Sequence, residues 1–174
     1  STAAVKIDGL VDLGAVETKT DATVNTFLGT TTTKLTSWAQ TARVSLLGGL
    51  ITADAVKTNV TTTARSNGTT AHTANHQLAN IKIAGIRLPL NIPKNYAVTI
   101  PGVASVTLNY SLHGKIDRLI GTMGWAIGVT LLKPVGSQPA GVTLLVNPVN
   151  QYLSEVDPAS GAGLAGTAYG TRVN

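Results

Sequence analysis

Three histidines are the side chains best suited to metal binding or acid–base chemistry. His72 and His76 stand four residues apart, a spacing that places two metal ligands on one face of a helix. They lie, however, in the Thr- and Ala-rich stretch 69–77, which favours extended backbone. In a strand, side chains four apart share a face but are separated by about 13 Å, too far for one ion. We therefore predict no metal site and expect both histidines to be solvated strand residues.

Nucleophilic catalysis needs a serine on a constrained turn, with a histidine and a carboxylate in reach. The chain contains no Gly-x-Ser-x-Gly motif. An enzyme would need His113 and an acidic residue to converge in a pocket. Gly161, Gly163 and Gly166 have the spacing of a dinucleotide-binding motif, but no strand–turn–helix context accompanies them. We therefore predict a protein that is not an enzyme and that holds no cofactor.

The eight acidic residues are thinly spread, with two close pairs. Asp8 with Asp12, or Glu155 with Asp157, has the spacing of a carboxylate pair or of calcium ligands. Isolated surface carboxylates are far more common, and we favour that interpretation.

Aromatic side chains are scarce, at 4% of the chain. Trp38, Tyr96 and Trp125 could stack on sugar rings in a ligand site, because each has an apolar face and a polar edge. Packing in the core or at strand ends is the simpler role and is favoured by their scarcity. Both roles stay open.

The composition favours a β-protein exposed to the outside medium. Hydrophobic residues make up 43% and charged residues only 12%, while Thr and Val are abundant. These β-branched residues favour extended backbone, and the absence of Cys excludes disulfides. The start of the chain, residues 1–5, fits a mature N-terminus after signal-peptide cleavage and equally a boundary within a longer chain.

The net charge of +5 comes from basic residues that are scattered rather than clustered. A nucleic-acid surface gathers its basic side chains on one face, so we expect no nucleic-acid partner. Weak attraction to an anionic wall polymer is an alternative to simple solubility. No stretch of eighteen apolar residues is present, which predicts no transmembrane helix.

Alternating apolar and polar residues predict several strands. The predicted inward-facing sets are Val5 with Ile7; Ala42, Val44 and Leu46; Val106, Leu108 and Tyr110; and Ile127, Val129 and Leu131. Turn residues predict two hairpins, one at Asn67-Gly68 and one over residues 97–110 around Pro101-Gly102. The best candidate for a helix is the short stretch 115–121.

These patterns predict one all-β domain over residues 1–174, an antiparallel β-sandwich of short strands with little helix. Residues 5–43 and 44–80 form an internal repeat, since Gly9-Leu10-Val11 and Gly49-Leu50-Ile51 open similar segments. A solenoid is the alternative to the sandwich. The glycine-rich stretch 160–170 predicts a loop before a last strand.

Five segments of the chain resemble the choice-of-anchor P family of secreted actinobacterial surface proteins. They are residues 47–56 (LGGLITADAV), 83–89 (IAGIRLP), 98–109 (VTIPGVASVTLN), 124–131 (GWAIGVTL) and 168–170 (AYG). The resemblance implies an exported protein held at the cell surface, and it implies no activity. Members often carry paired cysteines, which this chain lacks, and a C-terminal anchor, which we do not expect within residues 1–174.

We therefore expect a secreted, non-enzymatic structural protein of a bacterial cell surface. Edge or terminal strands would join copies into a fibre or layer. The terminal strand either pairs within the fold or is offered to a neighbour. The residues expected to mark assembly strands are Val5, Ile7, Leu10, Tyr169 and Val173. The alternative is an extracellular glycan- or polymer-binding adhesion module that uses Trp38, Tyr96 or Trp125.

Overall fold

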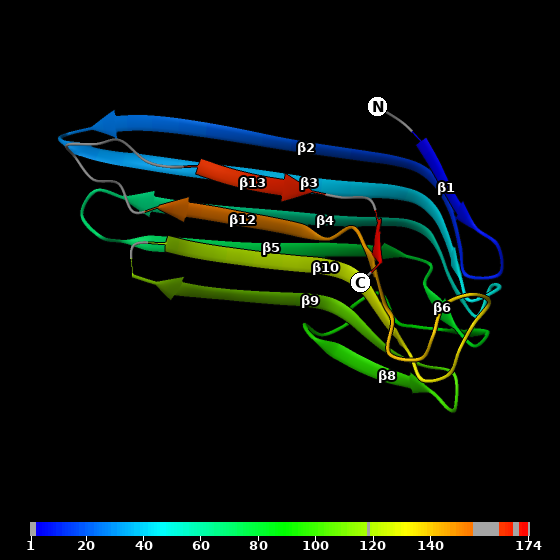
Figure 1. The fold of residues 1–174 in the computed structure, drawn as a ribbon. Helices are drawn as coiled ribbons and strands as arrows, with labels where there is room; N and C mark the ends of the chain where they lie inside the picture. Colours follow the sequence, from blue (N-terminus) through cyan, green and yellow to red (C-terminus); the bar gives the residue numbers. More distant parts are fainter. Residues whose placement is uncertain (1–2, 118, 155–163, 169–170, 174) are drawn as a thin grey trace.

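The computed structural model describes residues 3–117, 119–154, 164–168 and 171–173 (Figure 1). These residues form fourteen strands and no helix, arranged as two antiparallel sheets of seven strands that lie one over the other. The predicted all-β, sandwich-like fold is confirmed. The described part of the chain has no helix of the length and apolarity that a membrane span requires.

Sheet A is formed by the first half of the chain. Its strands are β1 (Ala3–Ile7), β2 (Val11–Phe27), β3 (Thr30–Leu46), β4 (Ile51–Arg65), β5 (Thr70–Ala79), β6 (Lys82–Ile83) and β7 (Ile86–Arg87). Strands β1 to β4 pair in chain order. The other side of β4 has two neighbours. Strand β5 pairs with the later part of β4, and β6 of the short β6–β7 hairpin pairs with the start of β4.

Sheet B is formed by the second half of the chain around a long central strand, β10. Its strands are β8 (Tyr96–Ile100), β9 (Ala104–Ile116), β10 (Leu119–Leu131), β11 (Thr143–Val146), β12 (Val149–Ser154), β13 (Leu164–Ala168) and β14 (Thr171–Val173). On one side β10 pairs with β9, which also pairs with β8. On its other side, the first part of β10 pairs with β12 and the later part pairs with β11. Strand β12 also pairs with β13, and β11 also pairs with β14.

The sandwich has two ends with different interiors. One end, which we call the base, holds the main apolar core between the curved ends of the strands (Figure 1). Its largest fully buried side chains are Leu13, Leu46, Ile51, Ile81, Leu108, Ile127, Leu131 and Leu144. The other end, which we call the arm, comprises residues 17–41, 56–79, 110–125 and 149–153. The arm contains two small apolar clusters, each of three buried residues.

Between these clusters the arm buries a polar network. Gln151 of β12 is fully buried and reaches sheet A, where its Nε2 donates to Ser37 Oγ at 2.9 Å and to the Val60 carbonyl at 3.1 Å. Its Oε1 accepts from the Thr62 hydroxyl at 2.8 Å, and Thr62 also contacts the Thr122 hydroxyl at 2.8 Å. Because the partners satisfy both ends of the amide, the network joins the two sheets without leaving that amide unpaired.

A second buried amide marks the boundary between arm and base. Asn147 lies between β11 and β12 and is fully buried. Its Oδ1 accepts from the Thr41 hydroxyl at 2.6 Å, and its Nδ2 donates to the Val56 carbonyl at 2.7 Å. Both partners belong to sheet A, so this side chain also holds the two sheets together.

At this boundary the inward-facing set of residues shifts by one along the strands. In β3, Thr41 and Val44 are both buried while Ala42 is exposed, and Arg43 between them has a positive φ of 49°. In β9, Asn109 has a φ of 53° and the buried set passes from Leu108 to Ser111. A residue in the left-handed region breaks the alternation of side chains. The predictions that Ala42 faces the core with Val44, and Tyr110 with Leu108, are therefore wrong.

Both predicted hairpins are confirmed. Asn67-Gly68 lies in the turn between β4 and β5, and Pro101-Gly102 lies in the turn between β8 and β9. The helix predicted at 115–121 is wrong, because this stretch is the end of the β9–β10 hairpin, with Leu119 paired to Ile116. In this strand hairpin Ile116 and Leu119 are exposed, whereas Ile120 is buried in one of the small arm clusters, so the apolar residues do not share one face.

Two further differences concern lengths and loops. Five strands have 13 to 17 residues, which is longer than the short strands expected. The stretch 160–170, predicted as a loop, contains β13, while the rest of that stretch lies outside the described residues. The similar segments that begin at Gly9 and Gly49 become β2 and β4, which lie parallel on either side of β3.

Candidate functional site

The most prominent surface feature is a long unpaired strand edge on β2. Strand β1 covers β2 only from Val11 to Val16. From Glu17 to Phe27 the strand pairs with β3 alone, and every side chain in this range is exposed. Among the described strands none lies on its other side. We call the outward backbone of residues 17–27 the β2 edge.

The β2 edge carries charged side chains at Glu17, Lys19 and Asp21, but its last six residues, 22–27, carry none. It has no proline, and its register with β3 runs without interruption from Val16 to Phe27. Its Lys19 and Asp21 form an ion pair at 2.8 Å, so its charges are partly compensated within the strand. An exposed, regular edge of this length is a template for an added strand.

A second unpaired edge lies at the opposite side of sheet A, on β5. Strand β5 pairs with β4 over Thr70 to Ala79, and no described strand pairs with its other side. We call the outward backbone of residues 70–79 the β5 edge. It carries no Lys, Arg, Asp, Glu or Pro. The two edges are thus of nearly equal length, 11 and 10 residues, and both belong to the arm.

Apolar side chains are exposed at the ends of two arm hairpins. In the β2–β3 turn Phe27 is 72% and Leu28 88% exposed. On the outer face of sheet B, Gly114 and Gly121 pair with each other and form the floor of a hollow of about 210 Å³. The apolar side chains around it are Leu112, Ile116, Leu119, Met123 and Tyr152. Exposed apolar surface of this kind is typical of contact regions.

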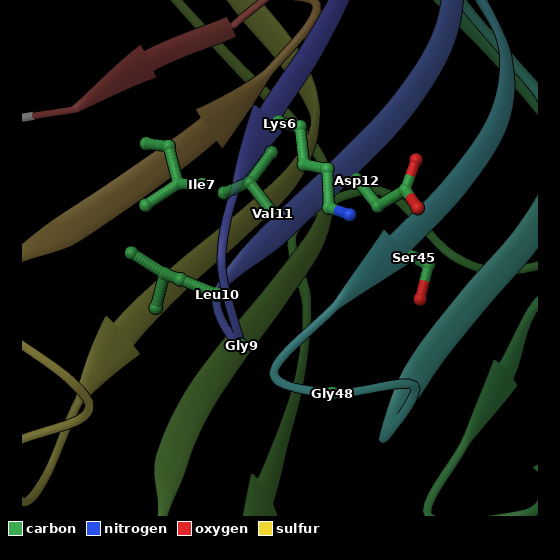
Figure 2. A pocket seen from close by; sticks show the side chains of 8 residues that line it. All are labelled: Lys6, Ile7, Gly9, Leu10, Val11, Asp12, Ser45 and Gly48. Carbon is green, nitrogen blue, oxygen red and sulfur yellow. The ribbon is translucent and has the colours of Figure 1, made fainter.

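The predicted assembly residues of the N-terminal strand lie against the core of the base. Val5 and Ile7 are half-buried on β1, and Leu10 in the following turn is only 2% exposed. Figure 2 shows Ile7 and Leu10 on one side of the β1–β2 turn and Lys6, Asp12 and Ser45 on the other, around a hollow of about 180 Å³. Leu10 is therefore a core residue, and β1 already has an intramolecular partner.

Of the predicted C-terminal assembly residues, Val173 lies in β14, where its backbone is opposite Leu144 of β11. The terminal strand thus pairs within sheet B, which was one of the two expectations. Tyr169 lies outside the described residues.

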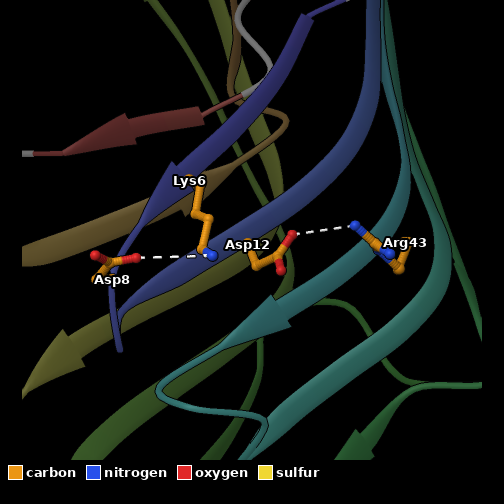
Figure 3. Close-up of polar contacts among 4 residues, drawn as sticks. All are labelled: Lys6, Asp8, Asp12 and Arg43. Atoms are coloured by element: carbon orange, nitrogen blue, oxygen red, sulfur yellow. Dashed lines mark hydrogen bonds and ion pairs between the residues drawn. The ribbon is translucent and has the colours of Figure 1, made fainter.

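The paired carboxylates do not converge. Asp8 forms an ion pair with Lys6 at 3.8 Å, and Asp12 forms one with Arg43 at 3.2 Å (Figure 3). Glu155 and Asp157 lie outside the described residues. In the described part of the chain, no three His, Asp or Glu side chains come together as metal ligands.

The three candidate aromatics are spread over different surfaces. Trp38 lies on the outer face of sheet A, with Lys57 Nζ at 5.0 Å from its ring centroid. Trp125 lies on the outer face of sheet B, stacked on Tyr110 at 3.8 Å, and its indole covers Gly128. Tyr96 is exposed at the start of β8. The fold therefore places the two tryptophans on opposite faces and forms no shared platform from them.

The histidines gather where β5 and β9 approach each other. The rings of His72 and His113 lie with centroids 4.0 Å apart. His76 is the deepest, and its Nδ1 lies 3.3 Å from the Thr58 hydroxyl. Burial lowers the pKa of His76 to about 4, so the expectation of a solvated side chain is wrong for this residue. His113 converges with a histidine and with Lys94 rather than with an acidic residue.

Comparison of the chain with models of protein families, with curated proteins and with solved structures found no match. The resemblance to the choice-of-anchor P family stays a prediction.

Proposed function

We propose that this chain is a structural subunit that self-assembles at a bacterial cell surface by pairing of its strand edges. The observation that supports the proposal is the β2 edge, an exposed and unpaired backbone edge of eleven residues. In this proposal the β2 edge of one copy adds to the β5 edge of the next copy, as in other strand-addition complexes.

The strand directions of the arm are compatible with this arrangement. Because neighbouring strands of sheet A are antiparallel, β2 and β5 run in opposite directions. A second copy that is shifted sideways without rotation therefore brings its β2 antiparallel to β5 of the first copy. Each added copy offers the same free edge again, and such head-to-tail contacts form open fibres rather than closed dimers.

Charge is compatible with pairing of β2 and β5. Glu17, Lys19 and Asp21 lie on one face of β2, and in pairing of β2 with itself the register decides whether like charges (Lys19 on Lys19) or opposite charges (Lys19 on Asp21) face each other. The β5 edge carries no Lys, Arg, Asp or Glu and tolerates every register of β2.

A glycan- or polymer-binding module is the rival proposal. It is less favoured because Trp38 and Trp125 lie on opposite faces of the sandwich and Trp125 is packed over Gly128 and Tyr110. The secreted location is supported by the composition and by the resemblance described above.

The test uses one variant for each edge. Val24→Lys introduces a charge on the exposed β2 edge, and Asn75→Lys introduces one on the β5 edge. We expect light scattering and negative-stain imaging to show fibres or layers for the native chain and monomers for each variant alone. An equimolar mixture of the two variants should form dimers only, because one intact β2 edge meets one intact β5 edge.

The matched control is Leu132→Lys, at an exposed position beyond the end of β10 in the base, which should assemble like the native chain. Dimers of Asn75→Lys alone would show that β2 pairs with itself and would exclude the β2–β5 contact. A native chain that stays monomeric at all concentrations would overturn self-assembly and direct attention to glycan binding.

A further inference from the structure

A small pocket opens between the edges of the two sheets, where β5 of sheet A approaches β9 of sheet B. Its volume is about 90 Å³, enough for one small ion. Lys94, from the segment before β8, and the imidazoles of His72 and His113 line it. The rest of the lining is neutral and consists of Thr73, Ala74, Ser111 and Thr122.

The ionisable side chains of this pocket are all basic. No carboxylate lines it, and Lys94 takes part in none of the ion pairs among the described residues. Burial lowers the pKa of His72, and the nearby His113 and Lys94 lower it further. The positive potential in the pocket is therefore not balanced by an acidic group of the protein.

Lys94 is held in place by its neighbour in sequence. Asn95, which has a positive φ of 56°, donates its backbone N–H to the Asn109 carbonyl at 3.1 Å. Its Oδ1 accepts from the Ser111 N–H at 2.9 Å. Both partners belong to β9, so the segment that carries Lys94 is attached to the strand that carries His113. This attachment holds the backbone at Lys94 next to the strand that carries His113.

One polar atom near this pocket lacks a partner. His72 Nδ1 is buried and forms no hydrogen bond. A buried imidazole nitrogen without a partner is unfavourable, and a ligand that contacts it would remove this penalty.

We propose that this pocket binds a small tetrahedral oxyanion of the phosphate type, held by Lys94, His72 and His113. The volume fits one such group, the lining offers cationic and N–H donors, and no carboxylate repels it. The ligand is either free phosphate or the terminal phosphoryl group of a larger molecule. The proposal does not depend on self-assembly, because it rests on side chains rather than on a free strand edge.

The test is a titration of the full chain with inorganic phosphate, in the Val24→Lys background if the native chain assembles. Binding is followed through the ring resonances of the three histidines in NMR spectra. Sodium chloride at matched ionic strength is the reference. We expect saturable shifts of the His72 and His113 resonances with phosphate and no saturation with chloride. Linear shifts that are equal for both salts would overturn the proposal.

Two lysine variants test whether phosphate binds in this pocket. Lys94→Gln should raise the dissociation constant at least tenfold, and Lys94 is exposed, so the fold should tolerate this change. Lys133→Gln removes one exposed charge outside the pocket lining and should change the dissociation constant less than twofold. Equal binding by native chain and Lys94→Gln would exclude the site.

A parallel titration with glycerol phosphate separates the two sources of the ligand. Saturable shifts of the same resonances at similar affinity indicate a pocket for a terminal phosphoryl group, whereas saturation with inorganic phosphate alone indicates a pocket for the free ion. The Val24→Lys variant should bind as the native chain does, so a failure of self-assembly and a failure of this site give different results.

Discussion

Gln151 on β12 donates through Nε2 to Ser37 Oγ on β3 at 2.9 Å, which joins the two sheets through a fully buried side chain. The same amide bonds the Val60 carbonyl and the Thr62 hydroxyl. In the arm, these hydrogen bonds connect the two sheets. In the base, aliphatic side chains do so.

Replacing this amide by an apolar side chain of similar size should destabilise the protein. Gln151→Leu removes one hydrogen-bond partner each from Ser37, Thr62 and the Val60 carbonyl, although Ser37 keeps Thr20 and Thr62 keeps Thr122. We expect a loss of about 1–3 kcal/mol, the usual cost when a buried polar group loses a partner. Urea denaturation should show a lower midpoint with an unchanged slope. Gln40→Leu, on the outer face of β3, is the control and should change the midpoint little. Equal midpoints for the two variants would contradict the proposed importance of the network.

Strands β2 and β3 approach each other closely at the boundary of arm and base. Adding one methyl group at Gly14 should therefore lower the stability of the protein. A Cβ at Gly14 would lie 2.4 Å from the Ala42 carbonyl oxygen, so Gly14→Ala must displace backbone. We expect a loss of about 1–3 kcal/mol, the usual cost of overpacking. Gly114→Ala meets no atom within 4 Å and should leave the thermal midpoint almost unchanged. A Gly14→Ala variant as stable as the native chain would mean that the two strands are farther apart.

Stability should fall as the pH is lowered from 7 to 4. The pKa of His76 is about 4 in the folded chain, below the ordinary value of 6.5. As the pH falls, His76 therefore becomes protonated at a higher pH in the unfolded chain than in the folded chain. The stability that is present above pH 6.5 is lost progressively between pH 6.5 and pH 4. The loss attributable to His76 is about 3 kcal/mol. Denaturation curves at pH 7.5 and 4.5 measure it, and in His76→Gln most of this difference should disappear.

The β2–β3 turn should become more stable when its first central residue is changed. Leu28 has a positive φ of 47° and is followed by Gly29 at 75°, the geometry of a turn that prefers Asn-Gly. A leucine in this conformation is strained by about 1 kcal/mol, and it is 88% exposed, so it contributes little packing. Leu28→Asn should raise the thermal midpoint, whereas Leu132→Asn, at another exposed leucine, should not. A lower midpoint for Leu28→Asn would indicate that Leu28 makes a stabilising contact.

The sequence allowed the fold class and two hairpins to be predicted, because these depend on local signals. Alternating Thr and Val residues favour strands, and Asn67-Gly68 and Pro101-Gly102 favour turns whatever surrounds them. The shift of the buried set at Arg43 and Asn109 has no such signal. Non-glycine residues rarely adopt positive φ, and only the packing of neighbouring strands imposes it here.

The candidate sites could not be predicted for a related reason. Whether β2 is an edge depends on which strands pair, and the exposed Thr-rich run 17–27 resembles any half-buried strand in the sequence. Similarly, His72 and His113 are 41 residues apart and meet because β5 and β9 are brought to the same side of two different sheets. Sequence spacing does not report contacts of this kind.

The hydroxyl- and amide-lined interior of the arm has a consequence for how stability varies with temperature. Exposure of apolar surface raises the heat capacity of an unfolding protein, while exposure of polar surface lowers it. Gln151, Asn147 and the buried threonines of β3 and β4 therefore reduce the heat-capacity change below that of a hydrocarbon core of equal size. We therefore expect a flatter stability curve than that of a sandwich with a purely hydrocarbon core, and a smaller loss of stability on cooling.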